Sequence, residues 1–166
     1  MTGLFNRRHF MEVAEATFAH AQRLGQPLFV LMLDVDHFKQ INDVHGHAAG
    51  DRVLADLAQS CREHIRPDDV AGRYGGDEFI VVIPGISSLR AIQIAARLTG
   101  PPARVTGADG QPVTFTVSVG IAECGTCPDL PTLFAHADAA MYEAKRAGGG
   151  CWRLYEETEQ AAALSR

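Results

Sequence analysis

The sequence predicts an α/β fold in which a mixed, mainly antiparallel central sheet is flanked by helices. Helical and strand-like patterns alternate along the chain, and the run 27–35, PLFVLMLDV, is apolar on both faces like a central strand covered by helices. Two further stretches, around Gly75-Gly76 and Asp109-Gly110, carry the glycine signals of hairpins. The 166 residues, of which 46% are hydrophobic and 21% charged, suit one globular domain.

Helices are predicted at five places. The first follows Asn6, a residue type that caps helices, and stops at Gly25, which suits a left-handed C-cap. Its apolar stripe comprises Phe10, Val13, Ala14, Thr17, Phe18, Ala21 and Leu24. The other helices are expected at about 36–44, 49–65, 88–98 and 130–146.

Strands are expected in the remaining apolar runs. The runs 69–75 and 77–84 form a hairpin in which Gly75 and Gly76 supply the positive φ of a primed turn. The segment 103–124 is a second hairpin, and 151–156 is a short edge strand. We therefore expect a domain over residues 1–156 and a C-terminal tail over 157–166.

Charge and hydropathy argue against two classes of protein. A formal net charge of −5 does not suit a protein that neutralises a nucleic-acid backbone. No apolar stretch approaches the roughly 18 residues of a membrane-spanning helix, and the first residues lack the apolar core of a secretory signal. We expect no contact of this segment with nucleic acid or membrane and a cytoplasmic location, which is compatible with a membrane anchor elsewhere in a parent protein.

Two cysteine and histidine patterns have the spacing of metal or redox sites. Cys124 and Cys127 form a C-x-x-C pair, but no second pair accompanies it, and we interpret it as a loop with two free thiols. His45 and His47 flank Gly46 and lack a third ligand at a fixed spacing. We interpret these histidines as local packing and hydrogen-bonding residues.

Acidic residues stand where the apolar runs begin and end. Asp34 interrupts the central apolar run and needs a cation, whereas Asp36 fits either the same site or the cap of the next helix. An EF-hand is excluded, because Phe38 and Lys39 occupy positions that the calcium loop reserves for a ligand and a glycine. If the Gly75-Gly76 hairpin lies beside the central strand, Asp77 and Asp34 share a hard divalent cation, Mg²⁺ or Mn²⁺.

The glycines of RYGGDEF allow backbone N–H groups to approach a triphosphate closely. No phosphate-binding loop of the form G-x-x-x-x-G-K-[ST] occurs in the chain. The pattern therefore favours metal-assisted nucleotidyl transfer.

Five motifs then give the chain a specific resemblance over almost its whole length. They are TGLFNRR, LDVDHFKQINDVHGHAAGD, RYGGDEF, VSVGIA and HADAAMYEAK, in this order. The chain resembles the GGDEF family, the catalytic domain of diguanylate cyclases, whose fold is similar to that of nucleotidyl cyclases and polymerase palm domains. The family motif normally begins a few residues before Thr2, so we expect a regulatory domain or partner protein outside this chain.

The resemblance implies a role for each matching residue. Asp34 and Asp77 match the side-chain metal ligands, Val35 a backbone carbonyl ligand, and Glu78 a residue that helps activate the attacking 3′-hydroxyl. Substrate binding is implied for Asn42 and Asp51 (guanine), Phe38 and Leu54 (walls of the base pocket), Lys39 and Lys145 (phosphates), and Gly75 and Gly76. A cation at a helix end is also favoured without a ligand, which is the alternative for Lys145.

The implied activity is the condensation of two GTP molecules into cyclic di-GMP with release of pyrophosphate, by a Mg²⁺- or Mn²⁺-dependent homodimer whose sites meet face to face. Gly149 departs from the family, which usually has an arginine there. The alternative is therefore a catalytically weak or silent domain that binds GTP, cyclic di-GMP or a partner protein.

A second site is implied upstream of the glycines. Arg66 and Asp69 form R-x-x-D nine residues before Gly75, as in the product-inhibition site of the family, and Arg97 is a candidate to complete it. Arginine suits bidentate phosphate binding and stacking on guanine. The alternative is an ordinary helix-to-strand turn, which Pro67 and its aspartates also favour.

Overall fold

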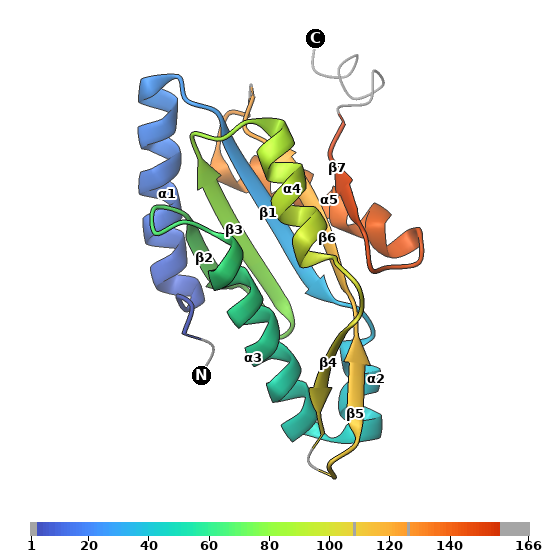
Figure 1. The fold of residues 1–166 in the computed structure, drawn as a ribbon. Helices are drawn as coiled ribbons and strands as arrows, with labels where there is room; N and C mark the ends of the chain where they lie inside the picture. Colours follow the sequence, from blue (N-terminus) through green and yellow to red (C-terminus); the bar gives the residue numbers. More distant parts are fainter. Residues whose placement is uncertain (1–2, 108, 126, 157–166) are drawn as a thin grey trace.

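The computed structural model describes residues 3–107, 109–125 and 127–156. Within them, a five-stranded sheet has the order β2-β3-β1-β6-β7, and β4 pairs with β5 in a separate two-stranded sheet (Figure 1). The strands are β1 (Leu28–Val35), β2 (Val70–Arg73), β3 (Glu78–Pro84), β4 (Ala103–Thr106), β5 (Pro112–Phe115), β6 (Val117–Glu123) and β7 (Trp152–Leu154). The helices are α1 (Arg7–Leu24), α2 (Phe38–His45), α3 (His47–His64), α4 (Ser88–Leu98) and α5 (Leu130–Arg146).

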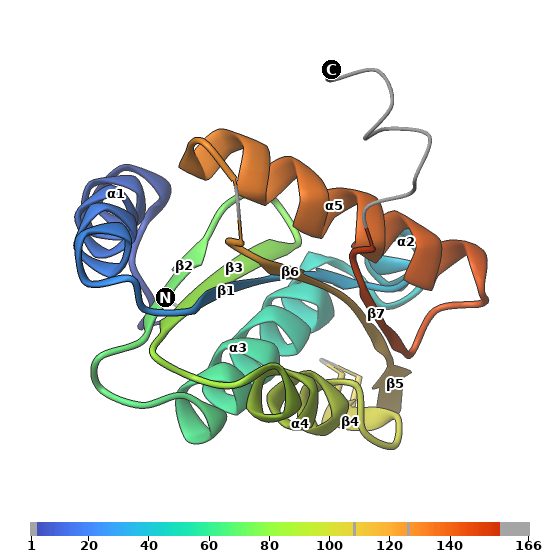
Figure 2. The same cartoon turned by 90° about the horizontal axis from the view of Figure 1, so that it is seen from above.

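The sheet is mixed but mainly antiparallel, as predicted. β1 runs antiparallel to both β3 and β6, β2 runs antiparallel to β3, and β7 runs parallel to β6 at the edge. Helices α1 and α5 cover one face of the sheet, and α3 and α4 cover the other (Figure 2). Every residue of β1 is buried, which confirms its prediction as a central strand.

Helix α1 confirms both predicted ends. The Asn6 side chain accepts a hydrogen bond from the backbone N–H of His9, and Gly25 adopts the left-handed conformation with φ 61°. The stripe differs at Leu24, which is 56% exposed. Leu24 is the last residue of the helix, where Gly25 turns the chain toward β1.

Helix α2 begins two residues later than expected. His37 precedes it with φ 56°, an uncommon conformation for a residue with a side chain, and provides no side-chain cap. Asp36 does not cap the helix either, because its carboxylate accepts hydrogen bonds from Thr116, Ser118 and Gly150. The capping interpretation of Asp36 was wrong.

The first predicted hairpin is present, but its turn differs. β2 and β3 pair antiparallel, and the Glu78 carbonyl accepts hydrogen bonds from the N–H groups of Tyr74 and Gly75. Gly75 and Gly76 are not among the glycines with positive φ, so the primed-turn explanation was wrong. Residues 74–77 connect the strands, and this longer connection does not need the backbone of a two-residue turn.

The second predicted hairpin is divided between two sheets. β4 and β5 pair antiparallel, whereas the chain passes Thr116 and enters the central sheet as β6. The alternating residues Val113, Phe115, Val117 and Val119 are buried on both sides of this break. Across the described ranges, no helix combines the length and apolar character that crossing a bilayer requires.

Candidate functional site

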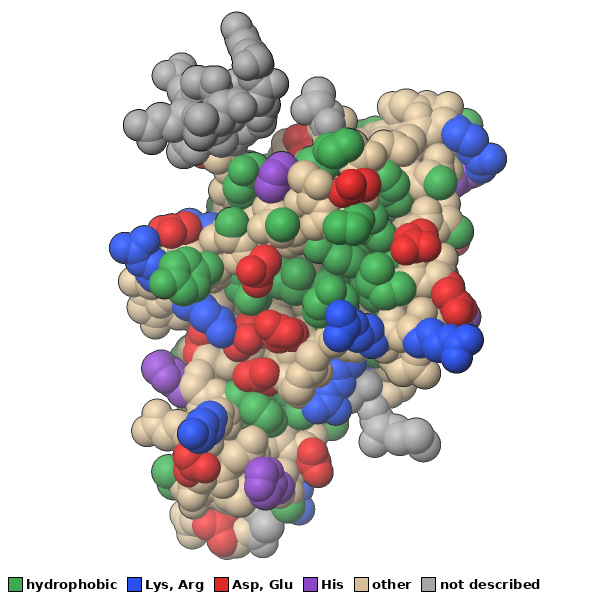
Figure 3. Space-filling view, turned by 180° about the vertical axis from the view of Figure 1, so that it is seen from behind, with side chains coloured by type: hydrophobic (Ala, Val, Ile, Leu, Met, Phe, Trp, Pro, Cys, Tyr) green, Lys and Arg blue, Asp and Glu red, His purple; other side chains and the backbone are tan. Residues whose placement is uncertain are grey.

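Three acidic side chains meet where β1 and β3 lie side by side. Asp34 on β1 pairs directly with Glu78 on β3, and Asp77 precedes Glu78. Directly opposed residues of an antiparallel pair project from the same face of the sheet. On the face that α1 and α5 cover, acidic side chains gather beside basic ones (Figure 3).

The pKa of the Asp34 carboxyl group is shifted upward. Burial raises its pKa from the ordinary 3.8 to about 6, the contact with Lys145 opposes this, and the charges of Asp77 and Glu78 raise it further. Lys145 Nζ lies 2.8 Å from Asp34 Oδ1, an oxygen that accepts no further hydrogen bond from the described part of the chain. The site therefore holds more negative than positive charge.

Helix α5 brings Lys145 to this point because it crosses β6 very closely. A Cβ on Gly120 of β6 would lie 1.9 Å from the backbone oxygen of Ala137 on α5, so only glycine permits this approach. The helix then continues over the sheet and carries Lys145 in its last turn. Position 120 thus fixes the distance between the helix and the acidic strand ends.

Arg73 stabilises the loop that carries Asp77. Its Nε donates to the carbonyl oxygens of Gly75 and Gly76 at 3.3 and 3.2 Å. A Cβ on Gly75 would lie 2.4 Å from Glu78 Oε2, so glycine leaves this space to the Glu78 carboxylate. We did not predict the role of Arg73, although it is the first residue of the RYGGDEF motif.

A second part of the site lies between α2 and α3. A Cβ on Gly50 would lie 2.0 Å from Asn42 Oδ1 and 3.1 Å from Phe38 Cζ, so the missing side chain leaves room for both. Asn42 Oδ1 is buried and accepts no hydrogen bond from the described residues. Leu54, one turn along α3 from Gly50, is 2% exposed, and Asp51 is exposed. An unsatisfied acceptor beside an exposed carboxylate suits a ligand that presents N–H donors, as the edge of guanine does.

The oxygen atoms at this site suit a hard divalent cation whose coordination sphere is completed by a bound ligand. Among the described residues, no three histidine, cysteine or acidic side chains form a preassembled metal site. Asp34, Asp77 and the Val35 carbonyl carry oxygen atoms, the kind of ligand that Mg²⁺ prefers, and Mg²⁺ is usually held by one or two carboxylates together with substrate phosphates. Lys39, on the first turn of α2, is exposed.

The R-x-x-D motif forms a closed turn beside a hollow. Arg66 NH2 donates to Asp69 Oδ1 at 3.0 Å and to the Pro84 carbonyl at 2.8 Å, and the Arg66 N–H donates to Asp69 Oδ2 at 2.7 Å. A hollow of about 350 Å³ next to it is lined by both residues and by Arg62. Arg97 is exposed on α4 and does not line this hollow. Product binding here stays a prediction.

The cysteine and histidine patterns do not form a metal site in the described residues. Cys124 and Cys127 are buried, and neither forms a disulfide with another described residue. Cys127 Sγ lies 3.5 Å from Nδ1 of His136 on α5.

Comparison with known proteins agrees with this geometry. The family model "Diguanylate cyclase, GGDEF domain" matches residues 1–151. The diguanylate cyclase DosC of Escherichia coli is 39% identical over 150 residues, which are 89% of this chain and 33% of that protein. The chain thus spans about a third of the length of this relative.

Two solved structures are also similar. The GGDEF domain of PA1120 from Pseudomonas aeruginosa is 37% identical with a TM-score of 0.86, covering 95% of this chain and 100% of that one. The GGDEF domain of DgcB from Caulobacter crescentus, in complex with c-di-GMP, is 29% identical with a TM-score of 0.85, covering 94% and 91%.

Proposed function

The chain belongs to the GGDEF family of diguanylate cyclases, and we propose that it condenses two GTP molecules into cyclic di-GMP and releases pyrophosphate. One observation carries this proposal. Asp34 is buried opposite Glu78 and beside Asp77, and it contacts the ammonium of Lys145. Such an excess of acidic groups, with a lysine next to them, is suited to a metal-bound polyphosphate.

Asp34 and Asp77, with the Val35 carbonyl, would hold Mg²⁺ or Mn²⁺. The metal would offset the charge of the phosphates and make the 3′-hydroxyl easier to deprotonate. Glu78 lies opposite Asp34 in the pairing of β1 with β3, and it would help to activate that hydroxyl. Lys145 and Lys39 would bind the phosphates, so Lys145 exchanges a carboxylate for a phosphate partner when substrate enters.

Asn42 and Asp51 would read the guanine edge. The Asn42 oxygen lacks a partner among the described residues, and a guanine N–H would satisfy it. Phe38 and Leu54 would enclose the base. Gly75 and Gly76 keep the loop free of side chains where the nucleotide approaches.

We further propose that the active form is a homodimer, because one such site would hold one nucleotide and the product contains two. Two chains then face each other, and each 3′-oxygen attacks the α-phosphorus of the other GTP. A second site formed by Arg66 and Asp69, which Arg97 would complete, would bind the product cyclic di-GMP. Product bound there would inhibit the condensation. A regulatory domain or partner protein outside this chain would control pairing in the cytoplasm, where GTP is available.

The test is incubation with GTP and Mg²⁺ followed by chromatographic separation of the nucleotides. We expect cyclic di-GMP and pyrophosphate from the wild-type chain, and neither from Asp77→Ala with unchanged circular dichroism. Asp109→Ala is the control and retains activity, because Asp109 lies at an exposed hairpin tip, where its side chain accepts a hydrogen bond from the Gln111 N–H. Absence of product even from a chain dimerised by a fused coiled coil would contradict the proposal.

One observation favours a second candidate, a domain that binds nucleotide without turnover. Gly149 provides no side chain for phosphate binding, and Asp36 lies where a side chain would begin. Such a domain would bind GTP or cyclic di-GMP in calorimetry while the chromatographic assay shows no product.

A further inference from the structure

We propose that Asp36 is a positioning residue that fixes the end of α5, and with it Lys145, beside Asp34. Asp36 directly follows β1 and is 8% exposed. The inference rests on the proposed function in one respect, the role of Lys145 as a phosphate ligand. Its geometry is independent of that function, and so is the labelling experiment that tests it.

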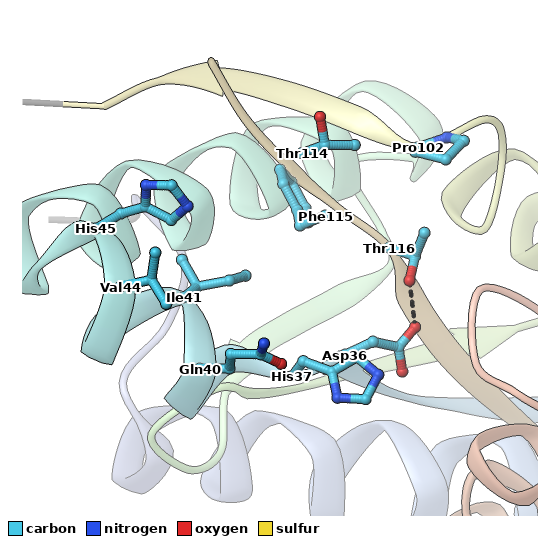
Figure 4. Close-up of a pocket in the computed structure, with 10 residues that line it drawn as sticks. All are labelled: Asp36, His37, Gln40, Ile41, Val44, His45, Pro102, Thr114, Phe115 and Thr116. Atoms are coloured by element: carbon cyan, nitrogen blue, oxygen red, sulfur yellow. Dashed lines mark hydrogen bonds between the residues drawn. The ribbon is translucent and has the colours of Figure 1, made fainter. Parts of the chain in front are cut away.

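The Asp36 carboxylate is bound by three donors from two distant segments. Thr116 Oγ1 donates to Oδ2 and Ser118 Oγ to Oδ1, both at 2.6 Å, and Gly150 N–H donates to Oδ2 at 2.7 Å. Figure 4 shows the first of these bonds at the edge of a cavity between α2 and β5. Short hydrogen bonds to an ionised acceptor are about twice as strong as neutral ones. Asp36 therefore ties the segment after α5 firmly to β6.

Three glycines in unusual conformations follow Ala147, the C-cap of α5. Gly148, Gly149 and Gly150 have φ of 111°, 76° and 61°, which residues with side chains rarely adopt. Gly148 N–H donates to the Lys145 carbonyl at 3.0 Å, and Gly149 N–H to the Ala144 carbonyl at 3.1 Å. The turn that Asp36 holds is thus bonded to the backbone of Lys145 itself.

Gly149 is shaped to fit the carboxylate. A Cβ at this position would lie 2.8 Å from Asp36 Cγ and Oδ2 and 2.9 Å from Oδ1. A Cβ on Gly148 meets nothing within 4 Å. Gly149, unlike Gly148, therefore packs directly against the Asp36 carboxylate.

Because the glycine turn is bonded to the backbone of Lys145, fixing the turn also fixes the backbone position of this lysine. Its side chain is 38% exposed, yet Nζ lies 2.8 Å from Asp34 Oδ1. Holding a long, partly exposed lysine in one geometry costs rotamer freedom, and a fixed helix end keeps movement of the backbone from adding to that cost. Asp36, through Gly150 and Gly148, supplies that fixed point.

Lysine labelling tests the proposal without any nucleotide. The chain has two lysines, Lys39 and Lys145, so the exposed Lys39 serves as an internal reference. The rate of modification by acetic anhydride is followed for each lysine by peptide mass spectrometry. In the wild-type chain we expect Lys145 to react several-fold more slowly than Lys39, because its amine is held at Asp34.

Three variants give the proposal its specific expectation. Asp36→Ala raises the Lys145 rate several-fold and leaves Lys39 unchanged. Asp36→Asn keeps the slow rate, since its oxygen still accepts from Gly150 while its amide donates to the Ser118 hydroxyl. Asp129→Ala is the control, because it removes the N-cap at the other end of α5 and costs helix stability without touching the turn.

A second pair of variants decides the matter if Asp36→Ala does not fold. Gly148→Ala and Gly149→Ala introduce the same kind of backbone strain, but only the second contacts Asp36. We expect a larger rise of the Lys145 rate in Gly149→Ala. An unchanged Lys145 rate in folded Asp36→Ala, or equal rates in the two glycine variants, overturns the proposal whether or not the chain makes cyclic di-GMP.

Discussion

Asp34 and Asp36 lie two residues apart at the end of β1, and both are buried, with exposed fractions of 6% and 8%. Their surroundings differ. Asp36 receives three hydrogen bonds from within the chain, whereas Asp34 contacts one partly exposed lysine and faces the charges of Asp77 and Glu78. A carboxylate that the protein satisfies has a structural role, and one that it leaves short of positive charge is prepared for a ligand.

The largest effect should separate the two aspartates by activity. Asp34→Asn removes a charged metal ligand and should lower turnover roughly 100-fold or more. Asp36→Asn keeps the hydrogen bonds and should retain most of the activity. Rates of cyclic di-GMP formation at saturating GTP and Mg²⁺ measure both, and similar losses in the two variants would remove the distinction.

Stability should show the opposite order. Asp36→Ala leaves the buried Ser118 hydroxyl and the half-buried donors of Thr116 and Gly150 without their acceptor, and should cost about 3 kcal/mol of unfolding free energy. Asp34→Ala removes a buried charge and one partly exposed ion pair, and should change it by less than about 1 kcal/mol. Urea unfolding followed by circular dichroism measures both, and a larger loss in Asp34→Ala would contradict the comparison.

A third buried aspartate extends the comparison. Asp69 is satisfied by Arg66, whose guanidinium also binds the Pro84 carbonyl. If the same guanidinium binds product, Arg66→Ala should raise the cyclic di-GMP concentration for half inhibition roughly tenfold, the loss of one charged hydrogen bond. Arg104→Ala, an exposed arginine on β4, is the control. Unchanged inhibition in Arg66→Ala would remove the second site.

The smallest effect is the part of the pH dependence of stability that Asp34 contributes. Because burial raises its folded pKa from 3.8 to about 6, the folded chain binds the proton more tightly than the unfolded chain. The stability that the protonated Asp34 carboxyl group contributes is fully present below pH 3.8 and is lost as the pH rises through about 6. The wild type should therefore lose less than about 2 kcal/mol relative to Asp34→Asn across this window, since solvent and Lys145 screen the charge. Parallel unfolding curves of the two chains would contradict this sign.

The sequence was enough to predict the surroundings of Asp34 but not those of Asp36. The apolar run of β1 indicated that Asp34 would be buried and in need of a cation, and the Gly75-Gly76 hairpin indicated that Asp77 would lie nearby. Asp36 was left open, because its partners Thr116, Ser118 and Gly150 are 80, 82 and 114 residues away in sequence. No local pattern reports contacts over such separations.

In the fold, too, features that depend on neighbouring residues were predicted, and features that depend on contacts distant in sequence were not. Helix caps such as Asn6 and Gly25 and the periodicity of apolar residues gave most elements near their observed bounds. The start of α2 was misplaced because His37 adopts a left-handed conformation, which only a few per cent of residues with a side chain adopt. The division of the second hairpin at Thr116 depends on which sheet each half packs into, and the alternation of apolar residues is the same in either case.

A crystal structure of the chain with Mg²⁺ and a non-hydrolysable GTP analogue tests the central claim most directly. We predict that the metal contacts the carboxylates of Asp34 and Asp77, that Lys145 has moved from Asp34 to the phosphates, and that Asp36 keeps its bonds to Thr116, Ser118 and Gly150. A nucleotide bound elsewhere, or one bound here with Lys145 still paired to Asp34 and no metal on Asp77, would contradict the account.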